Sequence, residues 1–125
     1  MYRGSCLCGE VRLVISGEIE RAMHCHCSMC QKAHGSAFAS YGLVRREAFQ
    51  LTGHDSVASY LSSPGVTRTF CRRCGANLMW ADESEFNRDW VSFSLALLDD
   101  ECQPQQHTEH FTESAPHWSP CQKRR

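Results

Sequence analysis

The sequence lacks any long hydrophobic run. No apolar stretch approaches the roughly 18 residues of a membrane-spanning helix, and the opening MYRGSCLCGE has no apolar segment of the secretory type. A strong charge of either sign is also missing, because 13 Lys and Arg oppose 14 Asp and Glu for a formal net charge of -1. These absences predict a soluble, cytoplasmic protein without a membrane partner. They also argue against a phosphate-binding surface and hence against nucleic-acid binding.

Helical periodicity is equally scarce. No segment keeps a 3.6-residue hydrophobic repeat over three turns, and only residues 27–34 suggest one short helical turn. Short segments with strand-like composition recur instead, separated by Gly, Pro, Ser and Asp turns. Strands are expected over residues 10–17, 37–44, 57–61, 67–70, 77–80 and 90–98. The sequence therefore predicts a mainly β protein.

The length of 125 residues suits one domain and is too short for two of ordinary size. A hydrophobic content of 42% is close to the globular average, so one core is expected. We therefore predict a single domain over residues 1–125. From about residue 100 the chain is rich in His, Gln and Pro, and we expect an irregular C-terminal tail there.

Cysteine is the residue present in excess. Nine cysteines occur in 125 residues, and seven of them fall in three short clusters. An odd count, close spacing and the absence of a secretory signal favour metal binding over disulfides, since reducing compartments keep thiols reduced. The clusters are Cys6-Leu7-Cys8, Cys25-His26-Cys27-Ser28-Met29-Cys30 and Cys71-Arg72-Arg73-Cys74.

The first and third clusters are predicted to form one closed zinc site. A glycine follows both the Cys6–Cys8 pair and the Cys71–Cys74 pair. Glycine permits a positive φ, which turns backbone N–H groups back toward the sulfurs. Two such pairs about sixty residues apart can occupy all four positions of a tetrahedral zinc. We expect this site to be structural, joining the N-terminal strand to the hairpin around residues 67–80.

Three other interpretations of the cysteines stay open. The chain could be a disulfide-rich secreted domain, or some of the cysteines could be unrelated members of the core. A third possibility is a ribbon-like site in which Cys27 and Cys30 pair with Cys71 and Cys74. That arrangement would leave three clustered cysteines without a function.

The middle cluster supplies the second predicted zinc site. Cys25, Cys27 and Cys30 offer three thiolates and leave one coordination position open, which is the usual arrangement of catalytic zinc. Three histidines lie nearby in the sequence: His24, His26 and His34. One of them could close the site as a fourth ligand. His34 is the stronger candidate, because an extended segment would turn His26 away from the cysteines on either side of it.

The two remaining cysteines stand apart from these clusters. Cys102 follows an acidic turn, and Cys121 lies close to the end of the sequence. Neither has a partner at metal-binding spacing. Both are expected to be exposed free thiols.

Taken together, the motifs resemble the glutathione-dependent formaldehyde-activating enzyme family. The matching segments are GSCLCGEV at residues 4–11, CHCSMCQKAHG at 25–35, SSPG at 62–65, RTFCRRCG at 68–75 and, less closely, APHW at 115–118. The resemblance implies a beta-tent fold of stacked antiparallel sheets and two zinc ions, divided among the cysteines as predicted above. Gln31 departs from the pattern, because a basic residue is common at that position in the family.

The resemblance also implies a reaction. Glutathione adds to formaldehyde to give S-hydroxymethylglutathione, or the adduct is cleaved, so the chain is expected to be a carbon-sulfur lyase. Lys32 and Arg68 are candidates for binding the two carboxylates of glutathione, although both could be ordinary solvated charges. His34 is a candidate donor to the oxyanion of the aldehyde. Two alternatives are a zinc-stapled structural or binding module without catalysis and a related lyase that acts on a different thiol adduct.

Overall fold

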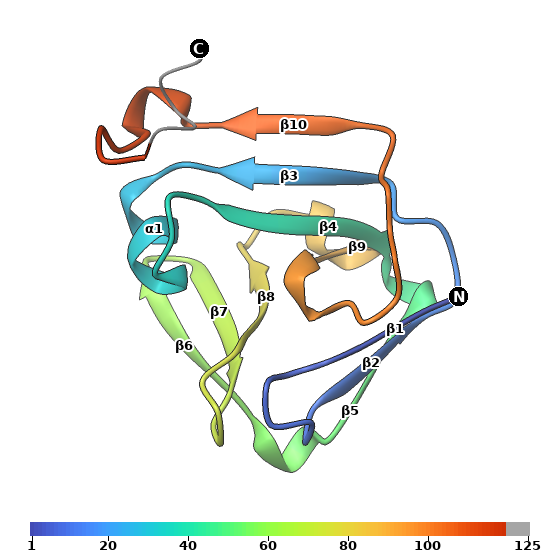
Figure 1. Cartoon of the computed structure of the whole chain (residues 1–125). Helices are drawn as coiled ribbons and strands as arrows, with labels where there is room; N and C mark the ends of the chain where they lie inside the picture. The colour runs from blue at the N-terminus through green and yellow to red at the C-terminus, as the bar shows by residue number, and fades with distance from the viewer. Residues whose placement is uncertain (120–125) are drawn as a thin grey trace.

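Two sheets account for most of the regular structure in residues 1–119, the part of the chain that the computed structural model describes (Figure 1). The smaller sheet has the order β1 (Tyr2–Ser5), β2 (Arg12–Ile15) and β5 (Phe49–Thr52). The larger sheet has the order β10 (His107–His110), β3 (Arg21–Cys25), β4 (Ala39–Arg45), β9 (Trp90–Ser94), β8 (Asn77–Ala81), β7 (Val66–Cys71) and β6 (Val57–Ser63). Both sheets are antiparallel except where β10 pairs with β3 in parallel. The prediction of a mainly β protein is confirmed.

Helical structure in residues 1–119 is limited to short segments, all of which lie between strands except the last, which follows β10. The two α-helices are α1 (Ser28–His34) and α2 (Phe86–Asp89). Four 3-10 turns are η1 (Arg46–Ala48), η2 (His54–Ser56), η3 (Leu95–Leu97) and η4 (Thr112–Ser114). Within residues 1–119 no helix has the length and apolar character needed to cross a membrane.

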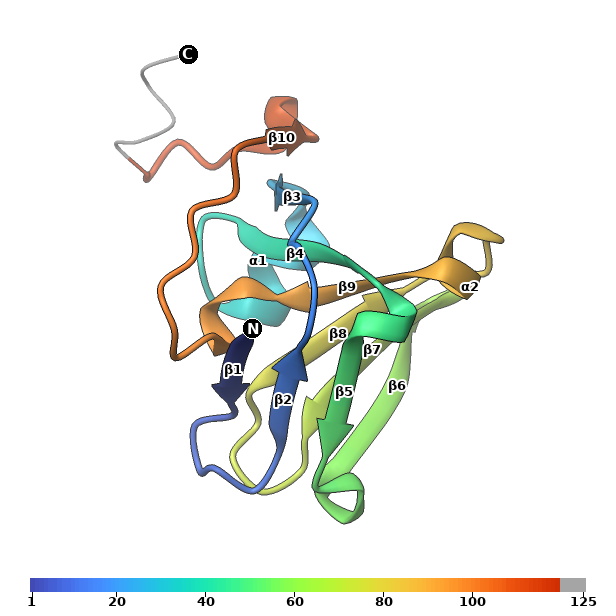
Figure 2. The ribbon, with the colours of Figure 1, turned by 90° about the vertical axis from the view of Figure 1, so that its right-hand side faces the viewer.

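The main core lies between the two sheets (Figure 2). Leu13 and Ile15 alternate along β2 and turn their buried side chains toward the larger sheet. Val44 of β4, with Val91 and Phe93 of β9, lies on the other side of this core. Each of these five residues is at most 4% exposed. Burial on this scale stabilises the fold by roughly 1.5–3 kcal/mol per large side chain, so the packing fixes how the sheets, and the cysteines on them, are placed.

All six expected strands are present, with most ends within two residues of expectation, and the structure adds four more. The strand expected over 90–98 ends at Ser94, where the 3-10 turn η3 begins. The short strands β1 and β3 lack the alternation of hydrophobic residues that predicts a strand, and β5 alternates over only four residues.

The expectation of an irregular tail after about residue 100 is wrong at β10. This strand lies along β3 with His107 opposite Ala22 and His110 opposite Cys25. Three of its four residues are exposed, so its sequence carries no alternating hydrophobic signal. Backbone pairing with β3 adds it to the sheet, together with polar side-chain contacts of His107 and Glu109. The consequence is that the C-terminal part of the described chain lies beside the middle cysteine cluster (Figure 1).

Candidate metal centres and active site

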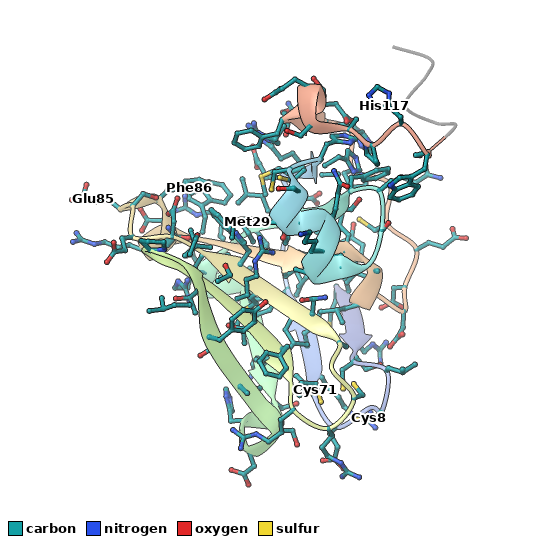
Figure 3. The ribbon with its side chains drawn as sticks, turned by 90° about the vertical axis from the view of Figure 1, so that its left-hand side faces the viewer. Cys8, Met29, Cys71, Glu85, Phe86 and His117 are labelled. Atoms are coloured by element: carbon teal, nitrogen blue, oxygen red, sulfur yellow. The ribbon has the colours of Figure 1, made fainter. Side chains whose placement is uncertain are left out.

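Four cysteines from two distant segments meet at one end of the molecule. The Sγ atoms of Cys6, Cys8, Cys71 and Cys74 all lie within 4.8 Å of one another. Cys6 and Cys8 follow β1, whereas Cys71 is the last residue of β7. Figure 3 shows Cys8 and Cys71 close together at the lower end of the sheets. The predicted pairing of these two segments is confirmed, and the ribbon-like alternative with Cys27 and Cys30 is excluded by this grouping.

The geometry of this four-cysteine cluster fits a tetrahedral metal. Metal–sulfur bonds of about 2.3 Å give sulfur–sulfur edges of about 3.8 Å in a regular tetrahedron. The Sγ atoms of Cys6 and Cys8 are 3.6 Å apart, and those of Cys8 and Cys71 are 3.8 Å apart. A set of four thiolates at these distances suits zinc and leaves no position for a substrate.

Backbone turns at glycine organise both halves of the cluster. Gly9 and Gly75 have φ values of 84° and 81°, a conformation that side chains disfavour. The N–H of Gly9 donates to the carbonyl of Cys6, and the N–H of Gly75 donates to the carbonyl of Cys71. The positive φ predicted for both glycines is confirmed, and after the first turn the backbone N–H of Val11 donates to Cys6 Sγ at 3.3 Å.

The middle cysteines form a second, separate cluster at the junction of β3 and α1. The Sγ atoms of Cys25, Cys27 and Cys30 lie within 4.8 Å of one another, with 3.5 Å between those of Cys25 and Cys27. Cys25 ends β3, Cys27 is the N-cap of α1 and Cys30 lies within that helix. The Cys27 sulfur accepts a hydrogen bond from the Cys30 backbone N–H at 3.4 Å. The distances again fit zinc, but here the described residues supply three ligands rather than four.

The nearby histidines take other partners. His26 is fully buried and its Nε2 lies 2.7 Å from Oε1 of Glu109, on β10. His34 Nε2 lies 3.2 Å from the hydroxyl of Tyr41. His24 lies between Ser40 and His107, at 2.8 and 3.0 Å. None of these histidines belongs to the metal-binding groups found within residues 1–119, so the structure gives no support to a fourth histidine ligand.

A buried arginine contacts the deepest cysteine of the triad. Arg68 is 4% exposed, and its guanidinium donates to Cys30 Sγ at 3.5 Å and to the Tyr41 hydroxyl at 3.2 Å. It also donates to Ser62 Oγ at 3.0 Å. Lys32, by contrast, is exposed on α1. The two cations singled out in the sequence therefore occupy very different surroundings.

These contacts favour the thiolate form of Cys30. The hydrogen bond with Cys25 lowers the pKa of Cys30 to about 4, and Arg68 and Tyr41 act in the same direction against the opposing effect of burial. The Cys30 contact and burial together raise the pKa of Cys25. Burial, reinforced by the neighbouring Cys30, raises the pKa of Tyr41, so this phenol keeps its proton at neutral pH. The contacts thus favour a thiolate on the one sulfur of the triad that lies beside a buried cation.

The three cysteines open onto a cavity of about 260 Å³. Its wall includes the triad and the Tyr41–Arg68 pair, and altogether it draws on seven strands, on α1 and on the segment that follows β10. The other lining side chains are Met23, Met29, Ser63, Val66, Trp80, Ser92, His110 and Phe111. Lys32 is outside this set. In Figure 3, Met29 on α1 lies well away from Cys8 and Cys71, so the cavity and the closed cluster occupy different parts of the molecule.

Several residues at or near the cavity were not predicted from the sequence. Tyr41 carried a usable signal, because it alternates with Ala39 and Leu43 on a predicted strand and all three are buried. Glu109 and Phe111 carried none, because they lie in the segment expected to be irregular. Their relation to the cysteines depends on the pairing of β10 with β3.

The structure tests the prediction for one of the two isolated cysteines. Cys102 is half-buried and packs against the main core, so the expectation that it is exposed is wrong. It belongs to neither cysteine cluster. Cys121 lies outside the described residues.

Comparison with solved structures supports the fold. A crystal structure of a Rhodobacter sphaeroides protein superposes with a TM-score of 0.63 at 20% sequence identity, covering 85% of this chain and 98% of that one. At this identity the likeness concerns the fold and not the activity.

Curated relatives are similar over part of their length. An uncharacterized lyase of Schizosaccharomyces pombe is 30% identical over 80 residues, which cover 64% of this chain and 57% of the relative. A Penicillium rubens protein named "Putative glutathione-dependent formaldehyde-activating enzyme" is 27% identical over 100 residues, covering 79% of this chain and 52% of the relative. The chain spans about half the length of the curated relatives it matches.

The family model described as glutathione-dependent formaldehyde-activating enzyme matches residues 1–114. This range contains both cysteine clusters and all ten strands of the two sheets. The resemblance inferred from the cysteine motifs is therefore confirmed, and the chain belongs to the glutathione-dependent formaldehyde-activating enzyme family.

Proposed function

We propose that the protein is a zinc-dependent carbon-sulfur lyase that adds glutathione to a small aldehyde or cleaves the adduct. One zinc would be held by Cys6, Cys8, Cys71 and Cys74 and a second by the Cys25–Cys27–Cys30 triad. The observation that carries the proposal is the contrast between these clusters, since four ligands close one site and three leave the other open to a cavity. The family and the lyase among the relatives support the same reaction class.

The chemistry requires a thiolate and an acceptor carbonyl. Bound zinc at the triad would favour the thiolate form of an incoming thiol at neutral pH. The thiol loses its proton, its sulfur forms a bond to the carbonyl carbon, the C=O π bond opens, and the oxygen takes up a proton. The product is a hemithioacetal, and the reverse sequence releases the aldehyde.

Residues near the triad would stabilise the negative charge that is present during this step. Three thiolates give the cluster an excess of negative charge, and a fourth sulfur would add to it. Arg68 is positioned to offset that charge because its guanidinium already contacts Cys30 and is shielded from water. Tyr41 lines the cavity with a protonated hydroxyl, so its Oη–H can donate a hydrogen bond to the substrate oxygen. His34 contacts this hydroxyl and does not line the cavity, so we assign it the role of positioning Tyr41 rather than of meeting the oxyanion directly.

The proposal is tested by measuring how fast free aldehyde and adduct interconvert. Formaldehyde and glutathione react without a catalyst, so exchange spectroscopy by NMR at equilibrium is preferable to measuring consumption alone. Zinc-loaded protein is expected to increase the exchange rate in proportion to its concentration. A zinc-loaded protein that accelerates no exchange with any thiol and aldehyde would instead indicate a structural or binding module. Acceleration with another thiol but not glutathione would identify a related lyase.

Substitution of the two candidate cations should separate their roles. Arg68→Gln is expected to lower kcat about 10- to 100-fold, the range typical of partners that support metal ligands. Lys32→Gln should leave kcat unchanged and raise KM for glutathione by no more than about fivefold, because an exposed lysine contributes at most about 1 kcal/mol to an ion pair.

Arg68→Lys is the matched control for charge, and zinc content and the circular dichroism spectrum check each variant. Partial recovery in Arg68→Lys supports charge compensation at Cys30. A raised KM for glutathione with normal kcat in Arg68→Gln would show that this arginine binds a glutathione carboxylate instead, as first predicted from the sequence.

A further inference from the structure

The cavity beside the triad is larger than formaldehyde requires. Its volume is about 260 Å³, whereas an apolar cavity of roughly 150 Å³ accommodates benzene. Formaldehyde has a single carbon and would leave most of this space unfilled. The surplus volume is therefore available to a larger substituent on one of the two reacting molecules.

The wall of the surplus space is apolar. Met23 of β3, Met29 of α1, Val66 of β7 and Trp80 of β8 contribute side chains from four separate elements, and Phe111 contributes a ring from the segment after β10. Methionine and aromatic side chains accommodate apolar groups of varied shape. The physical character of this wall suits a hydrocarbon group and would penalise a charged one.

The cavity is poorly suited to the charged ends of glutathione. Among its lining residues, Arg68 carries the only guanidinium or ammonium group, and that group is already bonded to Cys30, Tyr41 and Ser62. A carboxylate that entered would lose its hydration without gaining a free cation. The peptide part of glutathione is therefore better placed outside the cavity, with only its sulfur at the triad. The interior is left to the substituent of the aldehyde.

Phe111 is held at this cavity in an uncommon backbone conformation. Its φ of 57° is the only positive value at a non-glycine position in residues 1–119, and its side chain is 58% exposed. Gln31 anchors the adjoining segment to α1, because its Nε2 donates to the carbonyls of His26 and Ser114 at 2.8 and 3.0 Å. Because Phe111 is 58% exposed, its ring gains only part of the stabilisation that full burial would provide. Contact with a ligand would provide that burial.

We propose that the preferred aldehyde carries an apolar substituent of up to about phenyl size, which packs between Phe111, Met29 and Trp80. The inference rests on the proposed thiol-addition function and specifies its carbonyl substrate. The reaction is unchanged: the thiol sulfur bonds to the carbonyl carbon, and the thiol proton is transferred to the oxygen. Formaldehyde would be accepted as a small substrate that leaves the apolar wall unused.

Acetaldehyde and phenylacetaldehyde make a suitable pair of probes, because they differ only by a phenyl group on the carbon next to the carbonyl. With zinc-loaded protein and glutathione, kcat/KM from NMR exchange is expected to be at least about tenfold higher for phenylacetaldehyde, given the free energy of transferring such a group from water. Formaldehyde is measured in parallel. Acceleration with formaldehyde but no preference for phenylacetaldehyde over acetaldehyde would overturn the inference and leave the proposed function standing. Absence of acceleration with every aldehyde would overturn both.

Two cavity variants and one surface variant test whether the preference for phenylacetaldehyde arises from the apolar wall of the cavity. Phe111→Ala and Met29→Ala are each expected to reduce the phenylacetaldehyde-to-acetaldehyde ratio by about three- to tenfold. Both side chains are more than a third exposed, at 58% and 39%, so neither variant should prevent folding. Phe86→Ala is the matched control, because Phe86 is 45% exposed, stacks on Trp90 and does not line the cavity (Figure 3). An unchanged ratio in both cavity variants, or an equal decrease in Phe86→Ala, would overturn the inference.

Discussion

Cys27→Ser is expected to reduce bound zinc from two ions per chain to one, with the fold retained and glutathione-dependent exchange of formaldehyde lowered by at least about 100-fold. Loss of a partner that merely supports a metal ligand costs 10- to 100-fold, so loss of a ligand should cost at least the upper figure. The fold should survive because Cys27 is the N-cap of α1. A serine oxygen can accept the same hydrogen bond from the Cys30 N–H, and serine is among the preferred N-cap residues.

The measurement combines zinc analysis of anaerobically purified protein with the exchange assay and a circular dichroism spectrum. Ser28→Ala is the matched control, since Ser28 is an exposed neighbour that neither belongs to the triad nor lines the cavity. It should keep both zinc ions and full activity. Cys27→Ser protein with one zinc and undiminished activity would show that the triad is not catalytic. Two zinc ions in that variant would show that Cys27 is not an essential ligand.

Cys71→Ser is expected to leave the chain largely unfolded at 25 °C. Structural zinc contributes an apparent binding free energy of about 10–16 kcal/mol in small zinc-dependent domains, comparable to or larger than the 5–15 kcal/mol by which ordinary domains are stable. Cys71 is fully buried in the main core, and its sulfur lies beside that of Cys8, 63 positions earlier in the chain. Without this ligand the link between β1 and β7 is lost.

Thermal unfolding followed by circular dichroism, with and without a zinc chelator, provides the test. Wild-type protein should lose its cooperative transition when zinc is removed, and Cys71→Ser should lack the transition from the start. Cys102→Ser is the control, because Cys102 is half-buried but lies outside both cysteine clusters. Its free energy of unfolding should change by no more than about 1 kcal/mol. A cooperative transition in Cys71→Ser near the wild-type temperature would show that the closed site does not stabilise the fold.

The two substitutions together distinguish an enzyme from a zinc-stapled module. If both clusters were structural, Cys27→Ser and Cys71→Ser would destabilise the chain similarly. The proposed division predicts a stability loss confined to the closed cluster and an activity loss at the open one. The difference arises from coordination number, because the open cluster has three protein ligands within one short segment and encloses no long loop.

Some features could be predicted from the sequence because they depend on neighbours in the chain. A glycine after each of two cysteine pairs predicted that those pairs share one metal site, and the structure brings their four sulfurs within 4.8 Å of one another, with a positive φ at Gly75. Strands with clear alternation were also recognisable. By contrast, β10 was not predicted, because an exposed edge strand need not alternate hydrophobic and polar residues. The contact between Glu109 and His26 was therefore not predicted either.

Arg68 shows how far a residue's role depends on its surroundings. In the sequence it is one cation among many, and it was assigned to the carboxylates of glutathione. In the structure its guanidinium is buried against Cys30 and Tyr41, where it favours a thiolate. Burial changes the role because a charge removed from water interacts far more strongly with the few groups beside it.

The sequence by itself determined the two groups of cysteines that could bind metal, one of four residues and one of three, the mainly β class and the family. These properties follow from residue identity and short spacing, which fix how ligands of one segment can converge. Only the tertiary structure revealed the apolar cavity, the burial of Arg68 and the position of Phe111 in the wall of the cavity beside the triad. Their residues come from strands and loops up to 88 positions apart, between Met23 and Phe111. Such groups meet only through sheet pairing and core packing over long distances in the chain, and no local pattern records those contacts.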